Sequence, residues 1–404
     1  MKTLSALFLA GAFGAMSVCP VFAQPARDIA QANNKFAFDL YSRLDRKPGN
    51  VFFSPYSIST ALTMTYEGAH GKTADEMRTI LYLPSDEVNW REDISGFIQS
   101  MNAVRTSCEV STANALWAQK AYPFKADYLA LVQSSYFAEA RNLDFVTDPE
   151  ASRLTINSWV LAKTKDRIKN LLPSKSITSD TRLVLTNAVY FKGKWQSPFE
   201  KPFTKADTFW LDDARSVQTA MMALHEGSFH YNDNDQAQIL QLPYQGDDLS
   251  MLIVLPRSKD IRLLEKILNT DILKQWQEGM SSQKVNVYLP KFKFDADYQL
   301  KDSLAEMGMK TAFDGNDADF SGMVNTALGE KLYIGGVFHK AWIETNEEGT
   351  EAAAATAVVM EAGAAFPEHP PKEFRADHPF LFVIEDNKTG LILFMGRVSD
   401  PREK

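Results

Sequence analysis

The chain has 404 residues, of which 45% are hydrophobic, and it carries a formal net charge of −8. That apolar fraction is enough for a large buried core, whereas the negative charge disfavours general binding to nucleic acids or to anionic membrane surfaces. After the N-terminal segment no window offers 18 uncharged apolar residues, so we expect no membrane-spanning segment.

Residues 1–23 have the pattern of a secretory signal peptide. Met1-Lys2 precedes an apolar run over 4–18, and Val21-Phe22-Ala23 forms a small-residue cleavage site. We therefore expect this segment to be removed, leaving a mature chain over 24–404 that is secreted or periplasmic.

The sequence contains two cysteines. Cys19 belongs to the signal segment, and lipoprotein processing at this position is disfavoured because Val18 stands where a small residue is needed. Cys108 is then alone in the mature chain, so we expect no internal disulfide. We expect Cys108 to be a small, buried apolar residue, and stability must come from packing.

Helices dominate the expected secondary structure of the first half. Ser54-Pro55 provides an N-cap followed by proline at the first helical position. Helical periodicity extends this helix and predicts three others, which gives helices over 54–66, 73–81, 86–104 and 151–172.

Strands dominate the second half. The residue pattern predicts strands at 182–192, 238–243, 249–255, 284–290, 331–345, 380–385 and 391–398, with short helices at 260–269 and 298–307. Because helices and strands are segregated along the chain, the pattern indicates an α+β fold rather than repeating βαβ units. No internal repeat or flexible linker divides the chain.

Two local motifs resemble known sites but have the wrong spacing. Gly71-Lys72-Thr73 matches the end of a phosphate-binding loop, but Tyr66 stands where its first glycine is needed. His225 and His230 are five residues apart rather than four, with Gly227 between them, so they would not share one helical face. We expect no metal, no cofactor and no enzymatic activity; an unrecognised secreted hydrolase is kept as a remote alternative.

An ordered series of motifs resembles the serpin family over essentially the whole mature chain. The matching segments are 50–77, 156–172, 181–199, 287–309, HKAWIETNEEGTEAAAAT at 339–356 and FRADHPFLFVIEDNKTGLILFMGRVSDP at 374–401. Asp166 departs from the family, which usually has glycine there, and we expect this to affect one turn of a surface helix.

The resemblance implies a fold and an activity. The implied fold is a single serpin domain with three β-sheets, about eight to nine helices and an exposed reactive-centre loop over about 347–371. The implied activity is suicide-substrate inhibition of serine proteases, and also of cysteine proteases, through a covalent 1:1 complex. A non-inhibitory serpin that acts as a carrier or chaperone is the main alternative.

The segment NEEGTEAAAATAVVMEAG at 346–363 has few side chains large enough to anchor a core. Read as a strand, it places Thr350 and the alternate residues to Met360 on one uncharged face. Small side chains suit a segment that must pass between two existing strands, and Gly349 is a flexible pivot. A local helix capped by Thr350 and an interdomain linker remain alternatives for the uncut loop.

The resemblance assigns the hinge of the loop to this segment and implies that the cleaved loop enters the main sheet, sheet A. The matching hinge residues are Glu347, Glu348, Gly349, Thr350, Glu351, Ala352, Ala353, Ala354, Ala355 and Thr356.

Counting from the hinge predicts the bait bond. In inhibitory members the bait residue lies sixteen after the first hinge glutamate, which gives Gly363 and cleavage before Ala364. A small change of register would use Ala362 or Ala365 instead. No Arg or Lys occurs between 349 and 371, so the small residues favour elastase-like or subtilisin-like targets.

The resemblance implies two supporting clusters. The shutter, where the strands of sheet A part, matches Ser54, Ser57, Asn187 and His339, and the breach, where insertion starts, matches Trp195 and Lys291, the latter as ion-pair partner of Glu347. Ordinary structural roles, as an N-cap, strand polar residues or core residues, are the alternative.

The sequence favours no heparin-type activation. Acidic residues outnumber Arg91 within 84–104: Asp86, Glu87, Glu92 and Asp93. We expect a monomer.

Overall fold

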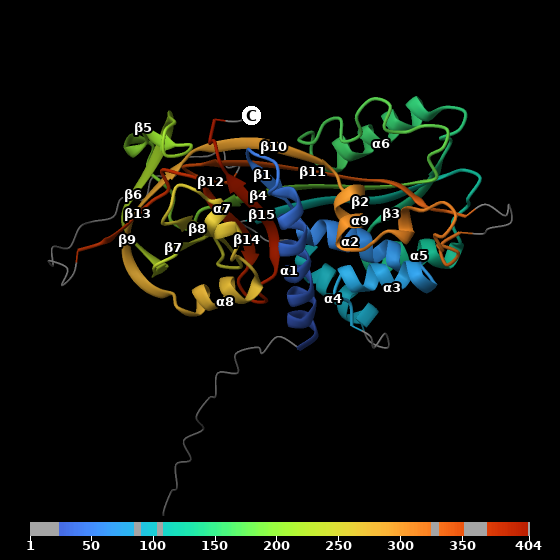
Figure 1. Cartoon of the computed structure of the whole chain (residues 1–404), viewed down its shortest axis with the longest axis horizontal. Helices are drawn as coiled ribbons and strands as arrows, with labels where there is room; N and C mark the ends of the chain where they lie inside the picture. Colours follow the sequence, from blue (N-terminus) through green and yellow to red (C-terminus); the bar gives the residue numbers. More distant parts are fainter. Residues whose placement is uncertain (1–23, 85–89, 103–107, 325–330, 351–369, 403–404) are drawn as a thin grey trace, which may run out of the picture.

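The computed structural model describes residues 24–84, 90–102, 108–324, 331–350 and 370–402, and its architecture is α+β. Figure 1 shows one large sheet with a group of helices against one face and helix α6 across the other. No helix within these described ranges is long and apolar enough to cross a membrane.

Sheet A has six strands in the order β10-β11-β12-β4-β2-β3, with β11 and β4 also paired directly. Its strands are β10 (Phe292–Gln299), β11 (Ile334–Asn346), β12 (Gly349–Thr350), β4 (Leu183–Lys194), β2 (Cys108–Gln119) and β3 (Glu139–Leu143).

The other strands form one network in the order β1-β15-β14-β8-β7-β6-β9-β13, with β5 paired to β6. They are β1 (Val51–Phe53), β15 (Ile392–Val398), β14 (Phe380–Asp386), β8 (Leu249–Pro256), β7 (Ala237–Pro243), β6 (Ser216–Asp233), β9 (Ser281–Pro290), β13 (Lys372–Arg375) and β5 (Lys205–Trp210). β6 and β9 pair on both sides of a register shift between Leu224 and Gly227, so the network is continuous where two separate sheets were expected. We call the part that contains β5, β13 and the segments of β6 and β9 paired with them sheet C.

The helices of the described ranges gather mainly in the first half of the chain. They are α1 (Gln24–Leu44), α2 (Pro55–Tyr66), α3 (Gly71–Ile80), α4 (Trp90–Asn102), α5 (Ala126–Tyr136), α6 (Pro149–Lys163), α7 (Arg262–Glu265), α8 (Thr270–Glu278) and α9 (Lys301–Met307), with the 3-10 turn η1 at Lys201–Phe203. The hydroxyl of Ser54 caps α2 by accepting from the backbone N–H of Ser57, as the Ser-Pro sequence predicts.

The sequence overestimated three helices. The structure ends α6 at Lys163, whereas periodicity extended this helix to Leu172, and it limits α7 to four residues. It also begins α9 at Lys301 rather than Tyr298, because β10 continues to Gln299.

Lys165 and Asp166 have left-handed φ values of +49° and +62°. Asp166 therefore lies beyond the helix end, in backbone that favours glycine and that Asp tolerates. The expectation that Asp166 alters a helical turn was wrong.

The sequence also missed β2, β6, β10 and the helices α1 and α5. In β2 the residues Ala113, Ala115 and Ala118 are buried like their larger neighbours, because both faces of the strand are covered. A strand with both faces buried and many alanines lacks the apolar alternation by which a half-buried strand is recognised.

Helix α6 packs onto the face of sheet A opposite the main helix group. Ile156 and Val160 of α6 share a buried cluster with Trp117, Ala188 and Phe338 of the sheet. Any strand that enters sheet A must therefore do so between a covering helix and the main core. The predicted burial of Cys108 is confirmed, since 6% of this residue is exposed.

Candidate functional site

Strands β11 and β4 pair along part of their length and then separate. They run parallel from Ile334, opposite Leu183, to Trp342, opposite Tyr190. Beyond this point β12 lies between them, antiparallel to both. The sheet is therefore closed at one end and held open at the other by Gly349 and Thr350, two residues of the hinge.

Gly349 fits this position because it has no side chain. Its φ is +152°, and a Cβ atom built on it would lie 2.1 Å from the carbonyl oxygen of Gly193. Any other residue would have to displace the backbone of β4.

Thr350 is completely buried between the two strands. Its Oγ1 lies 2.8 Å from the hydroxyl of Tyr244. The Tyr244 ring stacks on Trp195, with centroids 4.7 Å apart and planes 10° from parallel. Burial raises the pKa of Tyr244 well above its usual value, so its hydroxyl stays protonated and available to Thr350.

Trp195 also holds the backbone that leads into β12. Its backbone N–H donates to the Glu348 carbonyl oxygen, and its indole Nε1 donates to that of Asn346, both at 3.0 Å. The N–H of Phe199 donates to the Glu347 carbonyl at 2.8 Å. Two of these three hydrogen bonds to the backbone leading into β12 therefore come from one buried tryptophan.

The Glu347 side chain is only 7% exposed, and two donors satisfy it. Lys291 Nζ lies 2.9 Å from one carboxylate oxygen, and the Thr204 hydroxyl donates to the other at 2.9 Å. Burial alone would raise the pKa of Glu347, but these hydrogen bonds outweigh it and lower the pKa. Glu348 pairs with Lys201 at 2.7 Å.

The four residues assigned to the shutter lie together in the closed part of the sheet. His339 and Asn187 are opposite each other on β11 and β4, and Ser54 and Ser57 come from the start of α2. The N–H of Ser54 donates to His339 Nε2 at 3.2 Å, so the ring proton is on Nδ1, where it donates to Asn187 Oδ1. The Asn187 amide then donates to Ser57 Oγ.

Burial lowers the pKa of His339 from 6.5 to about 3, so the ring is neutral near pH 7. Asn114 on β2 completes the cluster, because its Oδ1 accepts from both Asn187 and Ser57. This residue was missed by sequence reasoning; the available signal was a polar amide within a run of small apolar residues. The cluster joins α2 to β2, β4 and β11.

A further contact missed from the sequence covers the point where the strands part. Trp342 lies at the last β11–β4 pair, and the guanidinium carbon of Arg167, from the segment after α6, is 5.4 Å from its ring centroid. Lys293 Nζ is 5.6 Å from the same centroid. Each is a cation–π contact.

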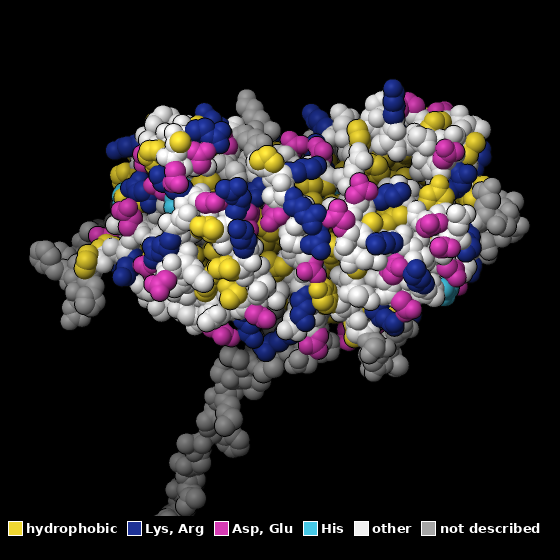
Figure 2. Space-filling view, in the orientation of Figure 1, with side chains coloured by type: hydrophobic (Ala, Val, Ile, Leu, Met, Phe, Trp, Pro, Cys, Tyr) yellow, Lys and Arg dark blue, Asp and Glu magenta, His cyan; other side chains and the backbone are white. Residues whose placement is uncertain are grey.

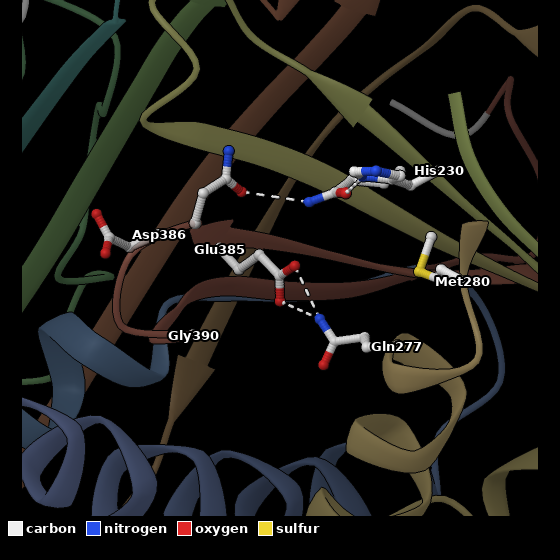
Figure 3. A pocket seen from close by; sticks show the side chains of 8 residues that line it. His230, Gln277, Met280, Glu385, Asp386 and Gly390 are labelled. Carbon is white, nitrogen blue, oxygen red and sulfur yellow. Dashed lines mark hydrogen bonds between the residues drawn. The ribbon is translucent and has the colours of Figure 1, made fainter. Parts of the chain in front are cut away.

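A separate cavity of about 270 Å³ lies among β6, β7, β14 and α8 (Figure 3). Buried Glu385 accepts two hydrogen bonds of 2.9 Å from Gln277, and burial raises its pKa to about 7. The cavity is lined by His230, Gln241, Gln277, Met280, Glu385, Asp386, Asn387 and Gly390. None of these residues belongs to β4, β11 or β12, so the cavity is separate from the hinge. Among the described residues no group of three His, Cys, Asp or Glu is placed to hold a metal ion.

Several predicted residues lie outside the described ranges. They are the signal segment 1–23, acidic residues Asp86 and Glu87, hinge residues Glu351, Ala352, Ala353, Ala354, Ala355 and Thr356, and bait residues Ala362, Gly363, Ala364 and Ala365. Their assigned roles stay predictions.

The fold agrees with comparison to known proteins. The family model for serpins, serine protease inhibitors, matches residues 31–401. The chain belongs to the serpin family, whose members generally inhibit proteases.

Its relatives span archaea and animals. An uncharacterized serpin-like protein of Methanosarcina mazei is 43% identical over 93% of this chain and 88% of its own length. Leukocyte elastase inhibitor of Bos taurus is 40% identical over 92% of this chain and 99% of its own. Serpin48 of Tenebrio molitor has a similar structure, with a TM-score of 0.83, 31% identity and coverage of 93% and 98% of the two chains.

Proposed function

We propose that this protein is a suicide-substrate inhibitor of serine proteases that traps its target by inserting the cleaved reactive-centre loop into sheet A. One observation carries the proposal: Gly349 and Thr350 already lie as a short strand between β11 and β4. Continued in the same direction, the loop would replace the direct β11–β4 pairs with its own.

The chemistry is that of an interrupted proteolysis. The protease serine attacks the carbonyl carbon of the bait residue, the bond to Ala364 breaks, and its amine leaves with a proton. The bait carbonyl is then esterified to the protease. Insertion must follow before water hydrolyses this ester.

The energy of insertion is large enough to deform a bound enzyme. About 15 inserted residues at roughly 3.3 Å each span about 50 Å, comparable to a whole domain. One or two dozen new hydrogen bonds, at about 1 kcal/mol each, give on the order of 10–25 kcal/mol. This exceeds the typical stability of a domain, about 5–15 kcal/mol.

The proposed targets are elastase-like or subtilisin-like proteases, with cysteine proteases as a second class. The bait region contains alanine and glycine and no basic residue, and a relative 40% identical to this chain bears the name leukocyte elastase inhibitor. We propose a secreted or periplasmic monomer, with the protease as partner. On the face shown in Figure 2, Lys and Arg side chains are interspersed with Asp and Glu, which gives no argument for a polyanionic activator.

A non-inhibitory carrier or chaperone is the second candidate. One structural neighbour, human thyroxine-binding globulin in complex with thyroxine, has a TM-score of 0.84 and 29% identity. The small hinge side chains of Ala352 to Ala355 favour inhibition instead, because large or charged residues there would oppose insertion.

The test is a denaturing gel of the mature chain mixed with pancreatic elastase, neutrophil elastase or subtilisin. We expect a band near the summed mass for at least one enzyme, and no band when the protease serine is first blocked by an organophosphate. Sequencing of the released C-terminal peptide should place its first residue within 361–366. If every enzyme only nicks the chain, the inhibitory proposal fails.

A further inference from the structure

Four side chains form a continuous strip across sheet C, at the end of the molecule where β5, β6, β9 and β13 lie (Figure 1). The ring centroids of Phe203 and His225 are 5.4 Å apart, and those of His225 and Tyr288 are 6.0 Å apart. The guanidinium carbon of Arg375 is 3.7 Å from the Tyr288 centroid. We call these four residues the aromatic strip.

The aromatic strip connects the two ends of the reactive-centre loop. Phe203 precedes Thr204, whose hydroxyl donates to Glu347 where the loop begins. Arg375 lies in β13, the first described strand after the loop, where it is opposite Tyr288 of β9. The proposed bait residue Gly363 is nine residues before β13, so a protease that holds it would lie within about 30 Å of the start of that strand.

The strip has the composition of a protein-binding surface. Phe203 is 41% exposed, His225 is exposed, and Tyr288 and Arg375 are partly exposed. Asp207 lies 2.9 Å from Arg375 and balances its charge, which reduces the cost of covering this residue. Aromatic and arginine side chains are enriched where interfaces gain most of their binding energy.

The bait itself offers little binding surface. The residues around the proposed bond, Ala362 to Ala365, have no side chain larger than a methyl group. Such side chains bury little apolar area in a protease pocket, so the four residues around the bond contribute little binding energy. Contacts away from the bond would then contribute much of the encounter.

We propose that the aromatic strip is a second docking surface for the same target protease, which contacts it through an apolar patch beside its active-site cleft. This inference rests on the proposed function. The strip speeds formation of the encounter complex, whereas partition between trapping and hydrolysis is decided at β12. The two steps can therefore be measured separately.

The test compares full-length mature variants Phe203→Ala and His225→Ala with the wild type, using one elastase-like and one subtilisin-like enzyme. The first readout is the second-order rate constant for loop cleavage, which is defined whether or not the protease is trapped. We expect each variant to lower it about fivefold to tenfold for at least one enzyme. The second readout, the fraction of cleaved chain found in covalent complex, should not change.

Phe137→Ala is the matched control, because Phe137 is 53% exposed and follows α5, at the opposite end of the molecule from sheet C (Figure 1). Its cleavage rate should equal that of the wild type. Wild-type rates for both strip variants, or an equal loss in Phe137→Ala, would overturn the inference. So would a dimer that Phe203→Ala dissociates in sedimentation, because the strip would then bind a second copy.

This experiment separates the two proposals. If the wild type is cleaved without trapping, the proposed function fails, while the cleavage rates still test the docking surface. If trapping occurs and the strip variants are cleaved normally, only the docking surface fails.

Discussion

At the scale of single residues, Thr350 links the loop to the sheet through one buried side chain. It has no exposed surface, and its hydroxyl meets that of Tyr244. The sequence alternation puts the next residue, Glu351, on the opposite face of the strand. A charge introduced at position 350 would have to be buried in the sheet, whereas a charge at position 351 would lie on the other face. Variants at the two positions can therefore be compared directly.

Thr350→Arg should convert the inhibitor into a substrate. A guanidinium at this site would be buried without a partner, which costs several kcal/mol. We therefore expect the hinge to leave the sheet in the intact variant and to incur this cost when it re-enters after cleavage. Each ~1.4 kcal/mol added to the insertion barrier slows insertion about tenfold, so hydrolysis of the acyl-enzyme would win. Gels and residual protease activity should show normal cleavage with release of active enzyme.

Glu351→Arg is the control and should trap protease nearly normally. The assigned facing of the strand is wrong if the two variants trap protease equally well, or if both fail.

Glu385 provides a second prediction, which concerns stability and pH. Burial raises the pKa of its carboxyl from 4.5 to about 7, so the folded chain keeps a proton that the unfolded chain releases. The stability this provides is fully present below about pH 4.5 and is lost as the pH rises through 7.

Glu385→Gln removes the charge while keeping a partner for Gln277. We expect it to stabilise the intact protein by about 2 kcal/mol at pH 8 and by little at pH 5. Thermal unfolding at the two pH values measures this difference, and the same change at both would show that Glu385 does not titrate as described.

At the scale of elements, the β11–β4 contact determines whether sheet A opens. The closed part is held by ladder hydrogen bonds and by the neutral His339 ring, which accepts from Ser54 and donates to Asn187. Protonation of His339 Nε2 would place a second ring N–H against the backbone N–H of Ser54, so that two hydrogen-bond donors face each other. Acid should therefore weaken the closed sheet.

The sign of the pH dependence follows from the pKa of His339. This pKa is lowered from 6.5 to about 3, so the contribution of the neutral ring is full above pH 6.5 and falls as the pH falls toward 3. Because Glu385 contributes with the opposite sign over this range, the test uses the Glu385→Gln background, in which we expect the melting temperature to decrease from pH 7 to pH 5. In His339→Gln the melting temperature should decrease less between pH 7 and pH 5. His230→Gln changes an exposed histidine and should show the full decrease. The same decrease in both variants would contradict the role assigned to His339.

Some helix and strand bounds follow from the sequence, and others do not. The N-cap at Ser54 and the strands around 182–192 and 331–345 follow from local residue preferences, and the structure confirms them with small shifts in bounds. The predicted end of α6 was wrong. The helical residue pattern continues beyond Lys163, but the backbone takes a left-handed conformation at Lys165, where the helix has already ended.

The contacts at the hinge could not be read from local sequence. Tyr244 and Thr350 are separated by 106 residues, and Arg167 meets Trp342 only through the way α6 crosses the sheet. The resemblance to a family supplied Trp195, Lys291 and the shutter residues, whereas Tyr244, Asn114 and Arg167 needed the three-dimensional arrangement. Side-chain contacts between distant strands depend on register, which a sequence pattern does not specify.

At the scale of the whole molecule, the intact protein has a sheet that is complete at one end and open at the other. β12 fills only the first positions between β11 and β4. A fully inserted loop would add a central strand with hydrogen bonds on both sides, while α6 would have to move to admit it. We therefore expect the intact form to be less stable than the cleaved form with its loop inserted.

Thermal unfolding of the intact protein and of the same protein cut once in the reactive-centre loop tests this account most directly. With a gain on the order of 10–25 kcal/mol and roughly 1 °C per kcal/mol in a chain of this size, the cut form should melt on the order of 10–25 °C higher. Equal melting temperatures for the cut and intact forms would mean that the loop does not enter sheet A, and would contradict the proposed mechanism.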